Sequence, residues 1–289
     1  MLELLQGSPG LLAGLVFAFG LLVGSFLNVV ILRLPPKLEY GWRRDAREHL
    51  ELPLDAEPEP PGIVVRPSGC PNCGHRLAPW ENIPLLSFAL LRGRCRGCGQ
   101  PISWQYPAVE LLTGLLFLAC ALRFGATPQC LAALAFTGTL VALAGIDVRT
   151  QLLPDAITLP LLWLGLLLAA TGVGFVDPVA AIAGAVAGYL SLWLVYQGFR
   201  LITGKEGMGF GDFKLLAALG AWCGGWAILP IVLMSSFIGA IVGGALMALQ
   251  GQDRDVHIPF GPYLATAGWV QLLWGESLLQ WYRNLSGLG

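Results

Sequence analysis

The sequence predicts an all-α polytopic membrane protein with about eight transmembrane helices and a small polar insert between the first two. Of the 289 residues, 55% are hydrophobic and only 12% are charged, whereas a soluble domain carries about 25% charged residues. Apolar stretches of roughly 20 residues, long enough to cross a bilayer, recur along the chain. These observations exclude a soluble globule, a disordered chain and a fibrous protein. The net charge of −1 gives no general attraction to nucleic acid.

The apolar stretches define the expected transmembrane helices. Each is close to the length that a spanning helix needs, except the sixth, which is short and rich in glycine. They lie at 11–33, 107–124, 129–147, 156–176, 178–200, 212–225, 227–249 and 263–281. The chain is therefore expected to comprise a first transmembrane helix (1–33), a polar insert (34–105) and a transmembrane core (106–289).

Basic residues set the expected orientation. Ten of the 17 Lys and Arg residues lie in the insert or at its entrance, and short loops rich in Lys and Arg stay in the cytoplasm. With eight spans, 15 basic residues fall on the side of the insert and only 2, Arg123 and Arg283, on the other. We therefore expect the N-terminus outside and the insert in the cytoplasm.

The insert contains two C-x2-C pairs, Cys70-Pro-Asn-Cys73 and Cys95-Arg-Gly-Cys98. Two residues between the thiolates let both sulfurs point at one tetrahedral ion, and the glycine after each pair permits a tight turn. We expect one structural zinc ion with four thiolate ligands, which leaves no coordination position for catalysis and helps to fold an insert with a poor core. Two disulfides or a redox relay remain alternatives, although a reducing cytosol disfavours them.

Two aspartates are expected to meet at the cytoplasmic face. Asp147 ends the third span and Asp212 opens the sixth; because the intervening spans go out and return, both acids reach the same side. Carboxylates at membrane depth are costly and therefore suggest function. Two carboxyl groups that share a proton can serve as acid and base toward water, and such a pair hydrolyses peptide bonds without a metal. The alternative is that each aspartate merely caps its own helix.

Residues near these aspartates have less certain roles. Gly209 and Gly211 are expected to let a substrate backbone approach closely and to adopt backbone angles closed to other residues. Lys214 is a candidate substrate contact, with pairing to a nearby carboxylate as its alternative. Asp155 rivals Asp147 but is better explained as the N-cap of the next helix. Glu110 is expected to favour the N-terminus of the second span.

Several segments together resemble the type IV prepilin peptidases. The resemblance covers roughly 20–282 in the same order, and no departure is visible in the motifs. The segments are GSFLNVVILRLP, ENIPLLSF, RCRGCGQPIS, YPAVELLTG, DVRTQLLPD and GMGFGDFKLLAALGAW.

The resemblance implies a multifunctional inner-membrane enzyme with its N-terminus in the periplasm and its active site at the cytoplasmic face. Members of this family cleave the basic leaders of prepilins, for type IV pili, and of pseudopilins, for type II secretion, after a glycine. Members with the cysteine-containing insert then N-methylate the new amino terminus with S-adenosylmethionine. By motif, Asp147 and Asp212 match the catalytic aspartates. The metal ligands match Cys70, Cys73, Cys95 and Cys98.

Other parts of the implied activity cannot be read from the sequence. No nucleotide-binding fingerprint locates the methyl donor, and the insert with segments 24–35 and 81–93 is the expected region. A membrane metal transporter and a membrane thiol–disulfide relay are the alternative functions. The first predicts acids through the membrane depth, and the second needs its cysteines on the oxidising side.

Overall fold

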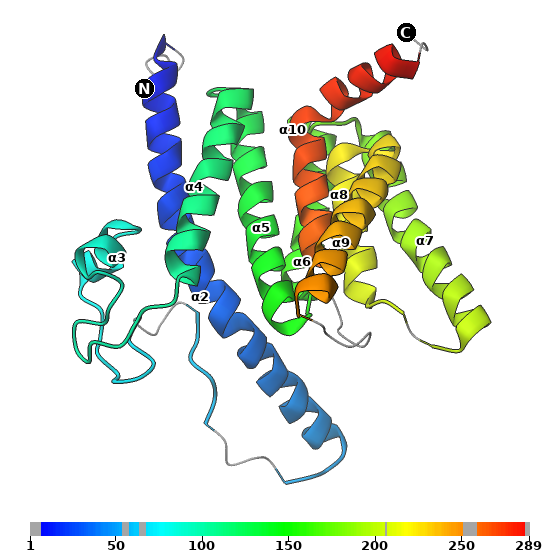
Figure 1. Ribbon diagram of the computed structural model, residues 1–289. Helices are drawn as coiled ribbons and strands as arrows, with labels where there is room; N and C mark the ends of the chain where they lie inside the picture. The colour runs from blue at the N-terminus through cyan, green and yellow to red at the C-terminus, as the bar shows by residue number, and fades with distance from the viewer. Residues whose placement is uncertain (1–6, 54–57, 64–67, 206, 251–258, 287–289) are drawn as a thin grey trace. The chain divides into compact units, whose positions relative to one another are not determined.

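The computed structural model describes residues 7–53, 58–63, 68–205, 207–250 and 259–286. Within these residues the chain is helical, and its β-structure is limited to two isolated bridges. It divides into two compact units, unit 1 (Met1–Ala126) and unit 2 (Thr127–Gly289). The helices of both units are labelled in Figure 1.

Unit 1 contains one long helix, α2 (Pro9–His49), and one shorter helix, α4 (Gln105–Phe124). They cross through small residues, because a Cβ on Gly20 would lie 2.8 Å from Cα of Gly114 and one on Gly24 would lie 2.7 Å from Cα of Glu110. Small residues at helix crossings in membranes let two backbones approach closely. Between the two helices the chain forms a short 3₁₀ helix, η1 (Pro79–Asn82), and the short helix α3 (Leu86–Leu90).

The prediction that the first helix ends at 33 is wrong. Helix α2 continues for 41 residues, through Pro35 and Pro36, to His49. At a rise of 1.5 Å per residue it is about 62 Å long, twice the thickness of the hydrocarbon core. Its second half carries seven of the charged residues that the sequence assigned to the insert, so the helix continues without a break into a segment suited to water.

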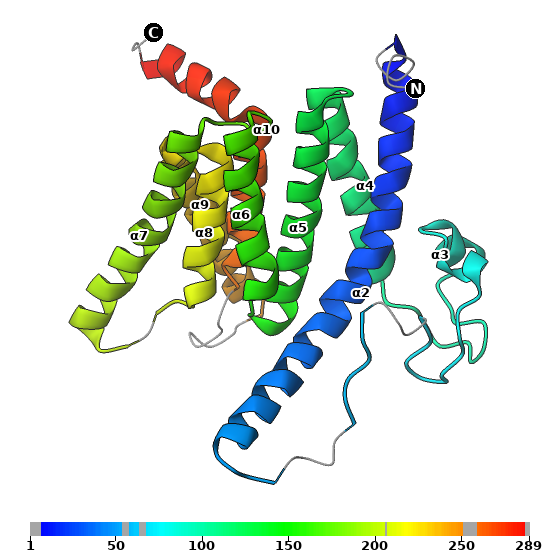
Figure 2. The same ribbon diagram turned by 180° about the vertical axis from the view of Figure 1, so that it is seen from behind.

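Unit 2 has six longer helices. Its element bounds are α5 (Pro128–Thr150), α6 (Asp155–Thr171), α7 (Pro178–Thr203), α8 (Phe210–Cys223), the 3₁₀ helix η2 (Gly225–Ala227), α9 (Ile228–Gln250) and α10 (Gly261–Ser286). Helix α8 is the centre of the unit, since it packs against α6, α7 and α10, as Figure 2 shows from behind. Ten of its fourteen residues are buried.

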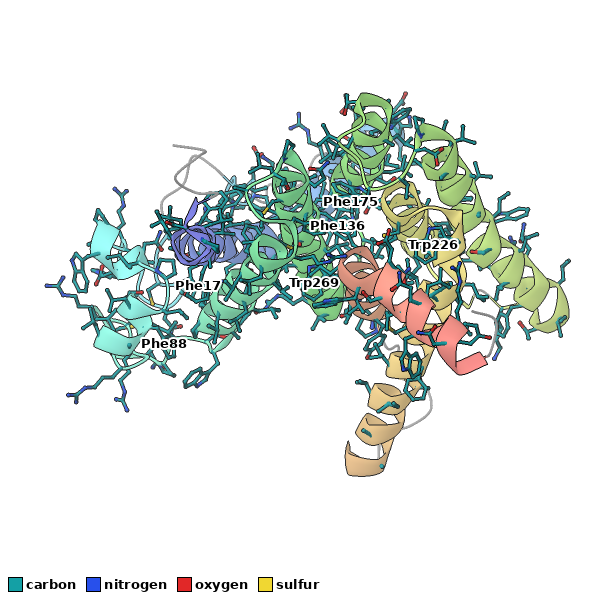
Figure 3. All side chains as sticks on the ribbon, turned by 90° about the horizontal axis from the view of Figure 1, so that it is seen from above. Phe17, Phe88, Phe136, Phe175, Trp226 and Trp269 are labelled. Atoms are coloured by element: carbon teal, nitrogen blue, oxygen red, sulfur yellow. The ribbon has the colours of Figure 1, made fainter. Side chains whose placement is uncertain are left out.

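Close contacts around α8 fix its neighbours. Gly184 of α7 and Gly220 of α8 touch through their backbones, so neither position has room for a side chain. The indole N–H of Trp222 donates to the Leu161 carbonyl of α6 at 2.9 Å. The rings of Phe136 and Phe175 both pack on Trp222, and both phenylalanines are labelled in Figure 3.

The predicted apolar stretches all coincide with helices, but not all of these qualify as spans. Five segments in the described part of the chain are long and apolar enough to cross a membrane, which supports a membrane-embedded protein. They are α2, α4, α5, α7 and Gly225–Ala245. Helices α6 and α8 have only 17 and 14 residues, so a count of eight crossings stays a prediction.

Candidate active site and metal centre

Asp147 and Asp212 lie at the same end of unit 2. Asp147 is in the last turn of α5, where Gln151 adopts a left-handed conformation (φ 56°) and donates its N–H to the Asp147 carbonyl at 2.9 Å. Asp212 is in the first turn of α8, which begins after Gly209 as N-cap. The two carboxyl groups are close enough for direct electrostatic interaction. They are therefore brought together, as the sequence predicts.

A third segment completes this site, and sequence reasoning missed it. The backbone N–H of Gly261, the first residue of α10, donates to Oδ2 of Asp147 at 2.9 Å. The side chain of Asp147 is buried, with 4% of the residue exposed. The order Phe260-Gly261-Pro262 could have indicated a helix start. No local pattern, however, signals a contact across 114 positions.

The glycines before Asp212 act differently from the prediction. Gly209 has φ −78°, and Gly211 lies in the first turn of α8 without a positive φ, so the expectation of unusual backbone angles is wrong. Gly211 is small because a Cβ there would lie 2.8 Å from Cβ of Leu153. Beside Gly209 the nearest atom to an added Cβ is Oδ2 of Asp212 at 4.0 Å. Close approach of a substrate at Gly209 remains a prediction.

Lys214 and Asp155 form an ion pair, with Nζ 2.7 and 2.6 Å from the two carboxylate oxygens. This pairing is the alternative that the sequence left open for Lys214. The N-cap role for Asp155 is wrong, because Pro154 is the N-cap and Asp155 is the first residue of α6. The pair connects α8, two residues after Asp212, to the start of α6, and both side chains remain partly exposed.

The four insert cysteines form one cluster in unit 1. Their sulfurs all lie within 4.8 Å of one another, with 3.8 Å between Cys70 and Cys98 and 3.9 Å between Cys73 and Cys95. Four thiolates around zinc, each at about 2.3 Å, place their sulfurs about 3.8 Å apart. The donor set thus fits a structural zinc ion, which would hold the two pairs together.

Each cysteine pair lies in its own turn, and the two turns have the same conformation. The N–H of Cys70 donates to the His75 carbonyl at 2.9 Å, and the N–H of Cys95 donates to the Gln100 carbonyl at 2.8 Å. Gly74 and Gly99 have φ of 70° and 72°, so the prediction that these turns need glycine is confirmed. The backbone N–H groups of Cys73 and Asn72 lower the pKa of the Cys70 thiol to about 6, which favours the thiolate that a metal requires.

His75 is not one of the four cysteine ligands, but it stabilises the turn that carries Cys70 and Cys73. Its Nε2 lies 3.2 Å from Oε2 of Glu81, and the same carboxylate accepts the Ala78 N–H at 2.7 Å. The Ala78 N–H and the contact with His75 lower the pKa of buried Glu81. Hydrogen bonds of this kind, which lie next to the ligands but do not involve them, orient the backbone around a metal site.

Glu110 anchors the insert to α4. The prediction that it stabilises a helix N-terminus is wrong: α4 begins at Gln105, and buried Glu110 accepts the N–H of Leu85 at 2.8 Å. Leu85 has φ 59° and ψ −44°, and Leu86 donates its N–H to the Pro84 carbonyl at 2.6 Å. This is a γ-turn of the rare strained type, held in place by the Glu110 carboxylate.

Comparison with known proteins finds two matching family models. The Bacterial Peptidase A24 N-terminal domain model matches residues 18–124, and the Type IV leader peptidase family model matches residues 134–244. Curated relatives named prepilin leader peptidase/N-methyltransferase match nearly the whole chain, and three of them serve as examples. The protein of Xanthomonas campestris pv. campestris is 55% identical over 98% of this chain and 99% of its own length. The chain belongs to the prepilin leader peptidase/N-methyltransferase family.

The other two relatives are similar over comparable lengths. The Aeromonas hydrophila protein is 55% identical over 98% of this chain and 97% of its own length. The Pseudomonas aeruginosa protein is 50% identical over 99% of each chain. No solved structure matches. The family models divide the chain close to the boundary between unit 1 and unit 2.

Proposed function

We propose that this chain is a membrane aspartic endopeptidase that removes the basic leader from prepilins and from type II secretion pseudopilins after a glycine. It then N-methylates the new amino terminus. The observation that carries the peptidase half is the meeting of Asp147 and Asp212 at one end of unit 2. The names of the relatives support both halves.

The peptidase step needs one ionised and one protonated carboxyl group. Asp147 accepts a proton from water while the water oxygen bonds to the scissile carbonyl carbon, and Asp212 donates its proton to the carbonyl oxygen. The resulting diol then collapses. The C–N bond breaks, the leaving nitrogen takes the proton from Asp147, and one diol hydroxyl returns a proton to Asp212. Both carboxyl groups end as they began.

The chemistry of the substrate fits the expected orientation in the inner membrane. A prepilin has a basic leader followed by an apolar helix, so the helix can lie in the bilayer while the scissile bond stays at the cytoplasmic surface. The Lys and Arg bias of the loops supports an N-terminus in the periplasm and the aspartates on the cytoplasmic side. Gly209, which leaves open space beside Asp212, is the proposed point of backbone approach.

The methyl-transfer half is assigned to unit 1. The four cysteines would hold a zinc ion that organises the two C-x2-C turns, and four thiolate ligands would leave it no open position for chemistry. S-adenosylmethionine supplies the methyl group when bound. The segments expected to hold it, 24–35 and 81–93, both contact Glu110, through the close backbone approach at Gly24 and through the Leu85 N–H. No nucleotide-type cradle is defined among the described residues.

The test is incubation of the purified full chain with a purified prepilin, with and without S-adenosylmethionine, and measurement of the product mass. We expect loss of the leader in both samples and one added methyl group only with the donor. An intact prepilin in both samples would overturn the peptidase proposal. A shortened but unmethylated product in both would overturn the methyltransferase half alone.

A further inference from the structure

We propose that Gly261 is a positioning residue for the peptidase reaction, because its backbone N–H holds one oxygen of Asp147 and thereby directs the other toward the reaction. This inference rests on the proposed function and adds a third chain segment to the two that carry the aspartates. It concerns unit 2 alone.

The hydrogen bond uses a backbone N–H that has no partner within its own helix. The first N–H groups of a helix have no partner within that helix. Gly261 is the first residue of α10, and its N–H is 2.9 Å from Oδ2 of Asp147 in a buried setting. A bond from an N–H to a carboxylate oxygen is stronger than one between neutral groups. The start of α10 is therefore a fixed support for this carboxylate.

The geometry requires glycine at this position. A Cβ on residue 261 would lie 2.7 Å from Oδ2 of Asp147 and 3.1 Å from Cδ2 of Leu153. Leu153 itself fills the space beside Gly211, where a Cβ would lie 2.8 Å from its own Cβ. Leu153 thus separates two glycines from different helices, one next to each aspartate. A side chain at 261 would have to displace either the carboxylate or this leucine.

A second contact holds α10 to the helix that carries Asp147. The indole N–H of Trp269 donates to the hydroxyl of Thr137 on α5 at 3.0 Å. The first turn of α10 is closed by the N–H groups of Tyr263 and Leu264, which donate to the Phe260 carbonyl at 3.1 and 3.2 Å. The start of α10, and with it the Gly261 N–H, is therefore fixed by hydrogen bonds within its first turn and by the contact of α10 with α5.

The consequence is an asymmetry between the two oxygens of Asp147. Because Oδ2 accepts the Gly261 N–H, Oδ1 is the oxygen that takes the proton from water. A rotation of the carboxylate would exchange these oxygens and break the bond. Gly261 acts through Asp147 and touches no substrate atom, so its effect belongs to turnover rather than to substrate binding.

The first experiment replaces Gly261 with Ala in the full chain and measures prepilin cleavage. We expect kcat to fall by about 10²-fold, as for a misplaced catalytic group, with KM little changed. Gly198→Ala in α7 is the control, because a Cβ there meets nothing within 4 Å, and it should cleave like the unaltered protein. Unchanged kcat in Gly261→Ala, or a rise in KM that accounts for the whole loss, would overturn the inference.

The second experiment separates the hydrogen bond from the steric effect. Glycolic acid incorporated at position 261 replaces the N–H with an oxygen and adds no side chain. We expect a loss of kcat without a change in KM, whereas glycolic acid at position 198 removes one helical N–H far from the aspartates and should preserve cleavage. Full kcat with glycolic acid at 261 would show that only space matters there, and it would overturn the positioning role.

The two experiments also distinguish this inference from the proposed function. If the unaltered chain fails to cleave prepilin, the proposed function fails. If it cleaves and the position-261 variants match it, the function stands and the inference alone fails.

Discussion

The cysteine cluster in unit 1 joins Cys70 to Cys98 across 28 positions, whereas the aspartate site in unit 2 is supported by a hydrogen bond across 114. The cluster is assembled from two copies of one short turn, each closed by its own backbone bonds and its own glycine. The aspartate site instead depends on the packing of three helix termini, the end of α5 and the starts of α8 and α10. Local spacing therefore determines the metal centre, and the packing of the whole unit determines the dyad.

Removal of the metal is the largest change expected. In the Cys70→Ser, Cys73→Ser double variant, unit 1 should lose zinc, because two of the four thiolate ligands are gone. It should then lose folding free energy, since binding of structural zinc supplies about 10–16 kcal/mol toward folding in small metal modules. Methyl transfer should be lost and leader cleavage largely kept. Metal analysis and both activities measure this, with Cys130→Ala as the control. Equal loss of both activities would contradict the independence of the two sites.

Loss of either aspartate should strongly reduce the second activity, leader cleavage. Asp147→Asn or Asp212→Asn should lower cleavage by about 10²–10⁴-fold, the range for general acid–base groups, while zinc content is unchanged. Asp177→Asn is the matched control, since Asp177 caps α7 through the N–H groups of Val179 and Ala180 and asparagine caps helices as well. Substantial cleavage by an asparagine variant would remove that residue from the dyad.

Glu110 tests whether the insert also depends on a distant contact. Glu110→Ala leaves the partly buried N–H of Leu85 without its acceptor, which should cost at most about 1–3 kcal/mol. Amide hydrogen exchange over 83–92 should become faster, and Glu110→Gln, which keeps an acceptor oxygen, should exchange more slowly than the alanine variant. Equal exchange in both variants and in the unaltered chain would show that the γ-turn does not need this carboxylate.

The ion pair of Lys214 and Asp155 should have the smallest effect. Both side chains are partly exposed, with 29% and 53% of their surface accessible, and such pairs contribute about 0.2–1 kcal/mol. Lys214→Met and Asp155→Asn should therefore lower thermal stability slightly and equally, and the double variant no further. A large rise in KM for prepilin in Lys214→Met alone would instead support a direct substrate contact.

Much of this structure could be predicted from the sequence, for identifiable reasons. The apolar stretches predict the helices because a bilayer demands long apolar segments, and the C-x2-C spacing predicts the metal centre because it reflects tetrahedral geometry. The end of α2 was missed because charged residues past Arg33 resemble a loop, although they also suit a helix in water. Gly261 was missed because its partner lies on another helix, and no periodicity encodes that contact.

The partners of Glu110 and Asp155 were missed for a related reason. Each acid lies near the start of an apolar segment, where a role at the helix end is the ordinary explanation. The structure gives each acid a contact with a residue distant in sequence instead, Leu85 and Lys214 respectively. Such contacts depend on the packing of elements that the sequence alone does not place.

The shortness of α8 affects how water reaches the reaction. With 14 residues, α8 is about 21 Å long, less than the roughly 30 Å of the hydrocarbon core. If α8 crosses the bilayer as the sequence predicts, its short length would place at least one of its ends, such as the segment 207–209, within the hydrocarbon core. Irregular backbone at such depth persists only when it is enclosed by protein or wetted. Water is the second substrate of the proposed hydrolysis, and an α8 that crosses the bilayer would need a wetted rather than an enclosed start to bring that water to Asp212.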